Sequence, residues 1–171
     1  EAVPDKVSAS GAETAMLVTF GGSHPDTGEF YSNLIIEGQG WGGKMIGDGW
    51  DVVTVPNANC VVTPVEVLET RFPLLHHEFS FNHGSGGAGK FRGGLGLRKD
   101  IILRCKEALA TLLTDRRKFA PFGVFGGEPG EKTRIVLTRN DEKRANNCSF
   151  QAHQNVLRSK RFSGFLQFKM F

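Results

Sequence analysis

The sequence has little of what secreted, disulfide-bonded or membrane-spanning proteins need. Its three cysteines, Cys60, Cys105 and Cys148, are an odd and widely spaced set, which fits neither a disulfide framework nor a metal-binding knuckle. Nowhere does an apolar run reach the roughly 18 residues of a membrane span. The first residues also lack the basic, apolar and small-residue order of a signal peptide. We therefore expect a cytoplasmic protein that does not enter a membrane.

Tyrosine is nearly absent, whereas phenylalanine and glycine are abundant. One tyrosine stands beside 14 phenylalanines and 22 glycines in 171 residues. The hydrophobic share of 39% and the charged share of 23% are ordinary for a globular domain of this length. So many glycines argue against a helical bundle, because glycine weakens helices.

Acidic residues are missing from the end of the chain. After Glu142 there are six basic residues and no acid, so residues 1–142 hold 15 basic and 18 acidic residues. The segment 143–171 also has five phenylalanines and one glycine. We therefore divide the chain into a mildly acidic body, 1–142, and an atypical basic, phenylalanine-rich tail, 143–171.

Short runs of branched and aromatic residues between turn signals predict strands. The expected strands are 16–20, 30–37, 50–55, 75–82, 97–105, 108–113 and 134–138. The first two should form a hairpin with a long loop over Gly21–Gly28, and six glycines within 38–49 exclude regular structure there. These patterns indicate an α+β, mainly β fold with few helices and long glycine-rich loops.

One helix is expected after residue 62. Thr63 would be its N-cap, Pro64 its first helical residue and Glu66 the acid three residues after the cap, with the helix ending near Thr70.

The glycine-rich run GSGGAGKFRGGLGL, residues 84–97, imitates two phosphate-binding loops. Gly84, Gly89 and Lys90 fit the Walker pattern, but Phe91 replaces the hydroxyl residue that binds Mg²⁺. Gly84, Gly86 and Gly89 fit a dinucleotide fingerprint. Both motifs need a helix directly after the loop, and the glycines at 93, 94 and 96 oppose one. A nucleotide loop is therefore not expected.

Two interpretations of this run remain. The glycines could form a compact turn between two strands, through positive φ and close backbone approach. Alternatively, their amides could bind an anion with the help of two basic side chains. The anion-binding candidates are Gly84, Gly86, Gly87, Gly89, Lys90 and Arg92.

Other charged or ligating residues give weaker signals. Asp115, Arg116 and Arg117 could form a structural bracket that holds a loop, although such a basic run is usually solvated. His76 and His77 are adjacent, so on a strand they face opposite sides and cannot share a metal ion. No spacing typical of a nucleophile and base, of paired carboxylates or of a metal site stands out, so catalytic residues stay unknown.

Four motifs in register resemble the hydantoinase B/oxoprolinase family. They are GWGGKMIGDGWDVVTVP, TPVEVLETRFPL, GSGGAGKFRGGLGLRKD and LLTDRRKFAPFGVFGGEPG. The resemblance covers about Val18 to Leu137 and implies the C-terminal portion of such a subunit. Because the chain begins at Glu1 without methionine, we expect a piece of a longer protein.

The resemblance implies an ATP-dependent cyclic-amide hydrolase of the hydantoinase or 5-oxoprolinase type, which acts on a small molecule together with a hydantoinase A-like ATP-binding subunit. ATP and a divalent metal are implied for the full hetero-oligomeric complex, with no cofactor in this chain. An acetone- or acetophenone-type carboxylase subunit and a non-catalytic assembly module are the alternatives. The isolated chain is expected to be inactive.

The tail departs from the family pattern. Family members end with a strand-rich segment that carries a Pro-Gly-Asp turn and a glycine-rich terminus, which do not occur after Asp141. The tail is therefore interpreted as frameshifted or altered, or as a basic extension. We do not expect it to bind nucleic acid.

Overall fold

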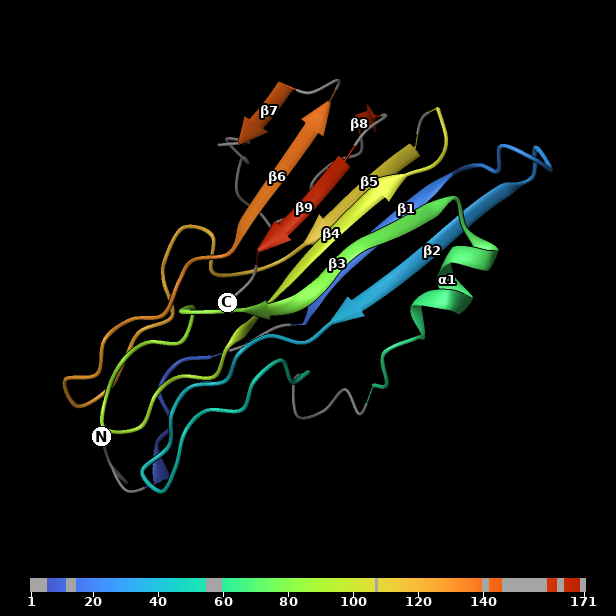
Figure 1. Cartoon of the computed structure of the whole chain (residues 1–171). Coiled ribbons are helices and arrows are strands. Elements are labelled where there is room, and N and C mark those ends of the chain that lie inside the picture. The colour runs from blue at the N-terminus through green and yellow to red at the C-terminus, as the bar shows by residue number, and fades with distance from the viewer. Residues whose placement is uncertain are drawn as a thin grey trace.

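The computed structural model describes residues 6–11, 15–54, 60–106, 108–139, 142–145, 160–162 and 165–169. Within them the chain forms two antiparallel sheets and one short helix (Figure 1). The prediction of a mainly β, α+β fold is therefore confirmed.

The first sheet has the strand order β2-β1-β5-β8. Its strands are β1 (Met16–Ser23), β2 (Phe30–Glu37), β5 (Ala108–Leu113) and β8 (Lys160–Phe162). The predicted hairpin is present, since Met16 pairs with Glu37 and Ser23 with Phe30. Its loop is shorter than expected, because Gly21 and Gly22 continue β1 instead of beginning the turn.

The second sheet has the strand order β3-β4-β9-β6-β7. Its strands are β3 (Leu74–Asn82), β4 (Gly96–Leu103), β6 (Arg134–Arg139), β7 (Glu142–Ala145) and β9 (Phe165–Lys169). Strand β9, which comes from the predicted tail, pairs with β4 on one side and β6 on the other. The division of the chain at residue 142 stays a prediction.

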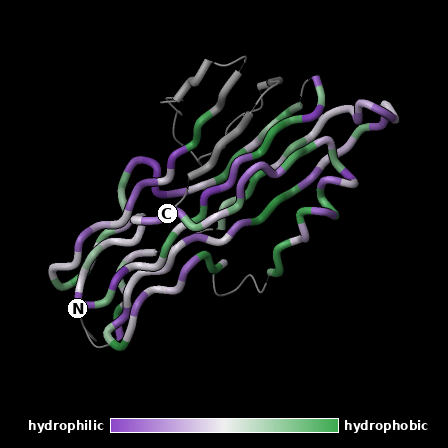
Figure 2. The backbone as a smooth tube through the Cα atoms, viewed as in Figure 1, coloured by the Kyte–Doolittle hydropathy of each residue, from purple (hydrophilic) through white to green (hydrophobic). Residues whose placement is uncertain are grey.

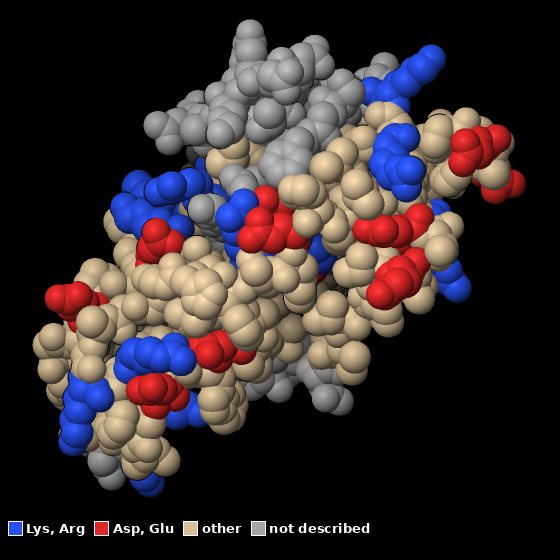
Figure 3. Space-filling model, in the orientation of Figure 1, with Lys and Arg blue, Asp and Glu red and all other residues tan. Residues whose placement is uncertain are grey.

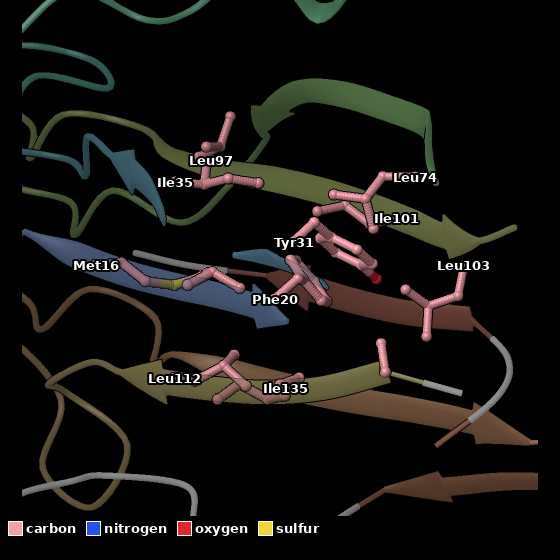
Figure 4. Packing of buried hydrophobic residues seen from close by; sticks show 13 residues of the cluster. Met16, Phe20, Tyr31, Ile35, Leu74, Leu97, Ile101, Leu103, Leu112 and Ile135 are labelled. Atoms are coloured by element: carbon pink, nitrogen blue, oxygen red, sulfur yellow. The ribbon is translucent and has the colours of Figure 1, made fainter. Parts of the chain in front are cut away.

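The hydrophobic core lies between the two sheets. Alternate residues of β1 and β2 point inward, so Met16, Val18 and Phe20 are buried together with Tyr31 and Ile35. They pack against inward residues of the second sheet, which include Leu74, Leu97, Ile101 and Ile135 (Figure 4). The alternation of apolar and other residues along the strands thus produces this core.

Helix α1 (Val65–Arg71) packs beside β3, and its Leu68 is buried. The predicted helix is present, but its predicted N-cap, Thr63, is wrong. Pro64 is the N-cap, with an extended backbone, and no side chain caps the helix; the Pro64 carbonyl accepts hydrogen bonds from Val67 and Leu68. Among the described residues, no helix has the length and apolar character to cross a membrane.

The predicted strand at 50–55 is wrong for its described residues. Only Val53 makes a ladder contact, an isolated antiparallel bridge to Gln39. The close approach of neighbouring glycine loops holds this segment instead, and Val52 has a left-handed φ of 45° that a strand would not allow.

Three long loops gather at one end of the sheets. They follow β2, connect β3 to β4, and connect β5 to β6. Antiparallel pairing brings the loops after β2 and β5 together, because the ends of these strands both lie beside the start of β1. These loops are largely pale in Figure 2, near the end marked N, as expected for glycine-rich chain. The candidate functional site lies among them.

Candidate functional site at the glycine-rich loop end

Backbone-to-backbone packing of glycines holds the loop end together. A Cβ added at Gly40 would lie 2.3 Å from the Gly94 carbonyl oxygen, and one at Gly94 would lie 2.0 Å from that of Trp50. A Cβ at Gly87 would lie 2.2 Å from the Glu128 carbonyl oxygen. Any larger side chain would therefore push two main chains apart. This close approach joins three of the four sequence motifs into one unit.

Main-chain hydrogen bonds follow the same contacts. The Gly94 amide donates to the Trp41 carbonyl at 2.7 Å, and the Gly49 amide donates to the Arg92 carbonyl at 2.8 Å. The Glu128 amide donates to the Ala88 carbonyl at 2.8 Å. The loops thus satisfy part of their backbone polarity with one another, in the way that strands of a sheet do.

Arg92 links two of these loops through charge. Its Nη1 donates to Asp51 Oδ1 at 3.0 Å, and its Nε lies 3.6 Å from Asp48 Oδ2. The hydrogen bond and charge of Asp51 raise the pKa of Arg92, and Arg92 in turn holds the pKa of Asp51 below its usual range. Asp51 Oδ1 also accepts from the Leu95 amide at 2.6 Å. The guanidinium therefore serves as a structural clamp.

An open cleft of about 290 Å³ lies between the loops. Residues of four segments line it, namely 7–10, 42–45, 87–93 without Arg92, and 121–130. Two lysines, Lys44 and Lys90, line the cleft together with one carboxylate, Glu128. On the face seen in Figure 3, basic side chains at this end stand beside acidic ones rather than forming a patch of one sign.

Aromatic side chains border the cleft and position one lysine. Lys44 Nζ lies 3.6 Å from the centre of the Trp50 ring, which packs against Trp41 with ring centres 5.9 Å apart. Phe122 and Phe125 line the opposite side and are 58% and 68% exposed. The cleft thus combines a glycine floor, two cations and an apolar rim.

Only some of the predicted anion-binding residues line the cleft. Gly87, Gly89 and Lys90 line the cleft, whereas Gly84 and Gly86 do not. Arg92 does not line it either, since its guanidinium is held by Asp48 and Asp51. Anion binding by this run therefore stays a prediction, now limited to its central part.

The interpretation of the run as a compact turn between two strands is confirmed, with one change. Positive φ occurs at Gly84, which has a φ of 82°, and not at the other glycines of the run. The others are needed for close approach. Strand β4 begins at Gly96, so no helix follows the loop and neither nucleotide-binding motif is formed.

The predicted bracket, Asp115, Arg116 and Arg117, begins the loop between β5 and β6. Arg116 has a left-handed φ of 58° and donates from Nη2 to Ser10 Oγ. Its carbonyl accepts from the Thr133 amide at 3.0 Å. Arg116 thus connects the N-terminal segment with the far end of the loop, and a bracket with Asp115 stays a prediction.

A buried ion pair that was not predicted from the sequence lies in the core. Lys99 of β4 and Glu37 of β2 are 2% and 1% exposed, and Lys99 Nζ donates to Glu37 Oε1. Within the described residues Glu37 Oε2 has no hydrogen-bond partner. Burial raises the pKa of Glu37, and the charge of Lys99 opposes the rise. Both residues occupy inward positions of their alternating strands, so the alternation in the sequence could have predicted that they are buried.

His76 is another titratable group with a buried side chain. Its Nδ1 lies 3.5 Å from Glu69 Oε1 of helix α1, and its amide donates to the same oxygen at 2.6 Å. Burial and then the positive charge of Lys99 lower the pKa of His76, against the opposing charge of Glu69. His77 is exposed, so the two histidines face different surroundings as predicted.

Within the described ranges, no three histidine, cysteine or acidic side chains gather as a metal site would require. The described residues therefore offer no set of ligands for the divalent metal that is implied for the full complex. We assign them no step that needs a metal.

Comparison with known proteins identifies the class. The hydantoinase B/oxoprolinase family matches residues 1–164, and the chain belongs to this family. A 5-oxoprolinase of Dictyostelium discoideum is 35% identical over 116 residues, which cover 68% of this chain and 9% of the relative.

Two solved structures share the fold with a TM-score of 0.70. An ATP-dependent caprolactamase from Pseudomonas jessenii is 22% identical over 98% of this chain and 29% of its own. An acetone carboxylase, described as catalysing ATP-dependent acetone carboxylation, is 17% identical over 96% of this chain and 26% of its own. The chain therefore spans less than a third of the length of each of these three proteins.

Proposed function

We propose that this chain is part of an ATP-dependent cyclic-amide hydrolase of the hydantoinase or 5-oxoprolinase type. It acts with a hydantoinase A-like ATP-binding subunit in a hetero-oligomer, and ATP and a divalent metal are used by the full complex. Family membership over residues 1–164 is the observation that carries the proposal. The identity of 35% to a 5-oxoprolinase favours hydrolysis over carboxylation.

This chain contributes a rigid end to that complex. Its loops are packed through glycine backbones and clamped by Arg92 against Asp48 and Asp51, so they can hold a shape without a large core of their own. Catalytic side chains are supplied by other parts of the complex. The isolated chain is inactive on this proposal.

Native purification tests the partner. A tagged form of the chain should retain a hydantoinase A-type protein, and the recovered complex should open 5-oxoproline or hydantoin while hydrolysing ATP. Gly94→Ala should reduce this activity, because its Cβ would collide with the Trp50 carbonyl. Gly47→Ala is the matched control, since a Cβ there meets nothing within 4 Å.

Other outcomes would select the alternatives. ATP hydrolysis that requires bicarbonate and a ketone, with none on cyclic amides, would identify a carboxylase subunit. The proposal would be overturned if no hydantoinase A-type chain were recovered and the purified chain turned over substrate alone. A partner bound without any turnover would indicate an assembly module.

A further inference from the structure

Residues 87–91, which line the cleft, have main-chain amides that find no acceptor among the residues that the structure describes. None of the amides of residues 87–91 donates a hydrogen bond to another described residue, whereas the next amide, of Arg92, donates to Asp48 Oδ1 at 2.9 Å. All five residues line the cleft. Ala88, Gly89 and Lys90 are exposed, so an entering molecule can reach their main chain.

Two cationic groups stand around these donors. Lys90 is itself one of residues 87–91, and Lys44 lines the cleft from the neighbouring loop, where the Trp50 ring contacts its ammonium. Arg92 is neutralised by Asp48 and Asp51. Among the described residues of the lining, Glu128 is the single acidic one, and it is exposed. Among the described lining residues, two ammonium groups therefore face one carboxylate, while Arg92 with its two carboxylates leaves one negative charge beside the cleft.

We propose that this cleft binds a small oxyanion, a phosphate or a carboxylate, through the amides of residues 87–91 and the ammonium groups of Lys44 and Lys90. Successive main-chain amides and lysines suit an oxygen anion, which accepts several charge-assisted hydrogen bonds at once. A cleft of about 290 Å³ has room for such a group. The apolar rim of Phe122 and Phe125 strengthens these bonds by excluding part of the water.

The identity of the anion rests on the proposed function. When ATP and water open a cyclic amide, the products are ADP, inorganic phosphate and an amino acid, or an N-carbamoyl amino acid from a hydantoin, whose new carboxylate comes from the ring carbonyl. Phosphate and carboxylate are therefore the two sources of an oxyanion in that reaction. Binding itself is measured without turnover, so its failure can be distinguished from failure of the proposed function.

The test is a titration of the full chain, labelled with ¹⁵N, with inorganic phosphate in one arm and glutamate in the other. Chloride at equal ionic strength provides the baseline. We expect the amide signals of residues 87–91 to shift saturably in at least one arm, and the arm with tighter binding identifies the source.

Two lysines with similar ring contacts form a matched pair of variants. Lys90 Nζ lies 5.5 Å from the Phe91 ring, and Lys118 Nζ lies 5.3 Å from the Phe119 ring outside the cleft. Lys90→Gln should weaken binding about tenfold, which is typical for loss of one charge-assisted hydrogen bond. Lys44→Gln should act in the same direction, and Lys118→Gln should leave binding unchanged.

Several results would overturn the inference. They are shifts that do not saturate in either arm, saturable shifts confined to residues outside the cleft, and equal weakening by Lys90→Gln and Lys118→Gln. Unchanged amide spectra of the variants without ligand confirm that each one is folded, which keeps the comparison decisive.

Discussion

At the scale of single residues, the unusual feature is charge inside the core. Lys99 and Glu37 lie between the sheets, where hydrophobic side chains would be expected, and Lys99 Nζ is also 5.0 Å from the centre of the Phe79 ring. A buried pair gains little net stability, because desolvation offsets its attraction, but each charge depends on the other.

Lys99→Met should therefore destabilise the chain strongly. It leaves Glu37 buried without a cation, which costs about 3–5 kcal/mol in comparable cases. Adding Glu37→Leu should recover most of this loss, because the pair is then replaced by apolar groups. Denaturant unfolding of the two single variants and the double variant measures this coupling. Additive losses would show that the two side chains do not act as a pair.

His76 predicts a pH dependence of stability. Its pKa in the folded chain lies below the ordinary value of 6.5, because burial and the charge of Lys99 disfavour the imidazolium. A lowered pKa means that the unfolded chain binds the proton more readily. The contribution to stability is therefore present above pH 6.5 and is lost as the pH falls through the folded pKa.

The measurement is the unfolding free energy between about pH 5 and pH 8, the range in which histidine titrates. His76→Gln should flatten the dependence in this window, whereas His77→Gln, at the exposed neighbouring position, should preserve it. A slope that survives in His76→Gln would assign the dependence to another group.

At the scale of elements, the sequence predicted regular structure better than the loops. Alternation identified the segments of β1 to β6, and β2 and β5 have the predicted bounds of 30–37 and 108–113. The strand at 50–55 was wrong because its apolar pattern is satisfied by contacts with other loops. The strands β7, β8 and β9 were not expected, since composition alone suggested an atypical tail.

The candidate site was predicted only in part, for a physical reason. The glycine run, Lys90 and the four motifs were visible in sequence, but the loops contact partners from distant parts of the chain. The contact of Arg92 with Asp51, for example, spans 41 residues. Lys44 and the loop at 121–130 therefore became part of the site only through the fold.

Loop packing gives a prediction at this scale. Gly94→Ala should lower the unfolding free energy by about 1–3 kcal/mol, the usual cost of overpacking, since its Cβ would lie 2.0 Å from the Trp50 carbonyl oxygen. Gly47→Ala should change stability little, because its surroundings are open and its φ is not left-handed. Thermal unfolding of both variants tests this, and equal effects would contradict the close packing of the loops.

At the scale of the whole molecule, the loop end differs from an ordinary protein surface. Met45 of the cleft lining is 47% exposed and its neighbour Ile46 is 90% exposed, and Phe122 and Phe125 of the lining are exposed as well. Neighbouring exposed apolar side chains of this kind mark surfaces that associate. Phe125 also has a left-handed φ of 52°, which is unfavourable for a bulky residue.

We therefore expect the isolated chain to self-associate through this end as its concentration rises. Ile46→Asn combined with Phe125→Asn should reduce the association seen by sedimentation velocity without lowering the melting temperature, because asparagine tolerates a left-handed φ. Phe30→Asn is the matched control, since Phe30 is 78% exposed but begins β2 at the opposite end of the sheet. If Phe30→Asn reduced association as much as the double variant, general surface hydrophobicity would be responsible and the loop end would lose its special role.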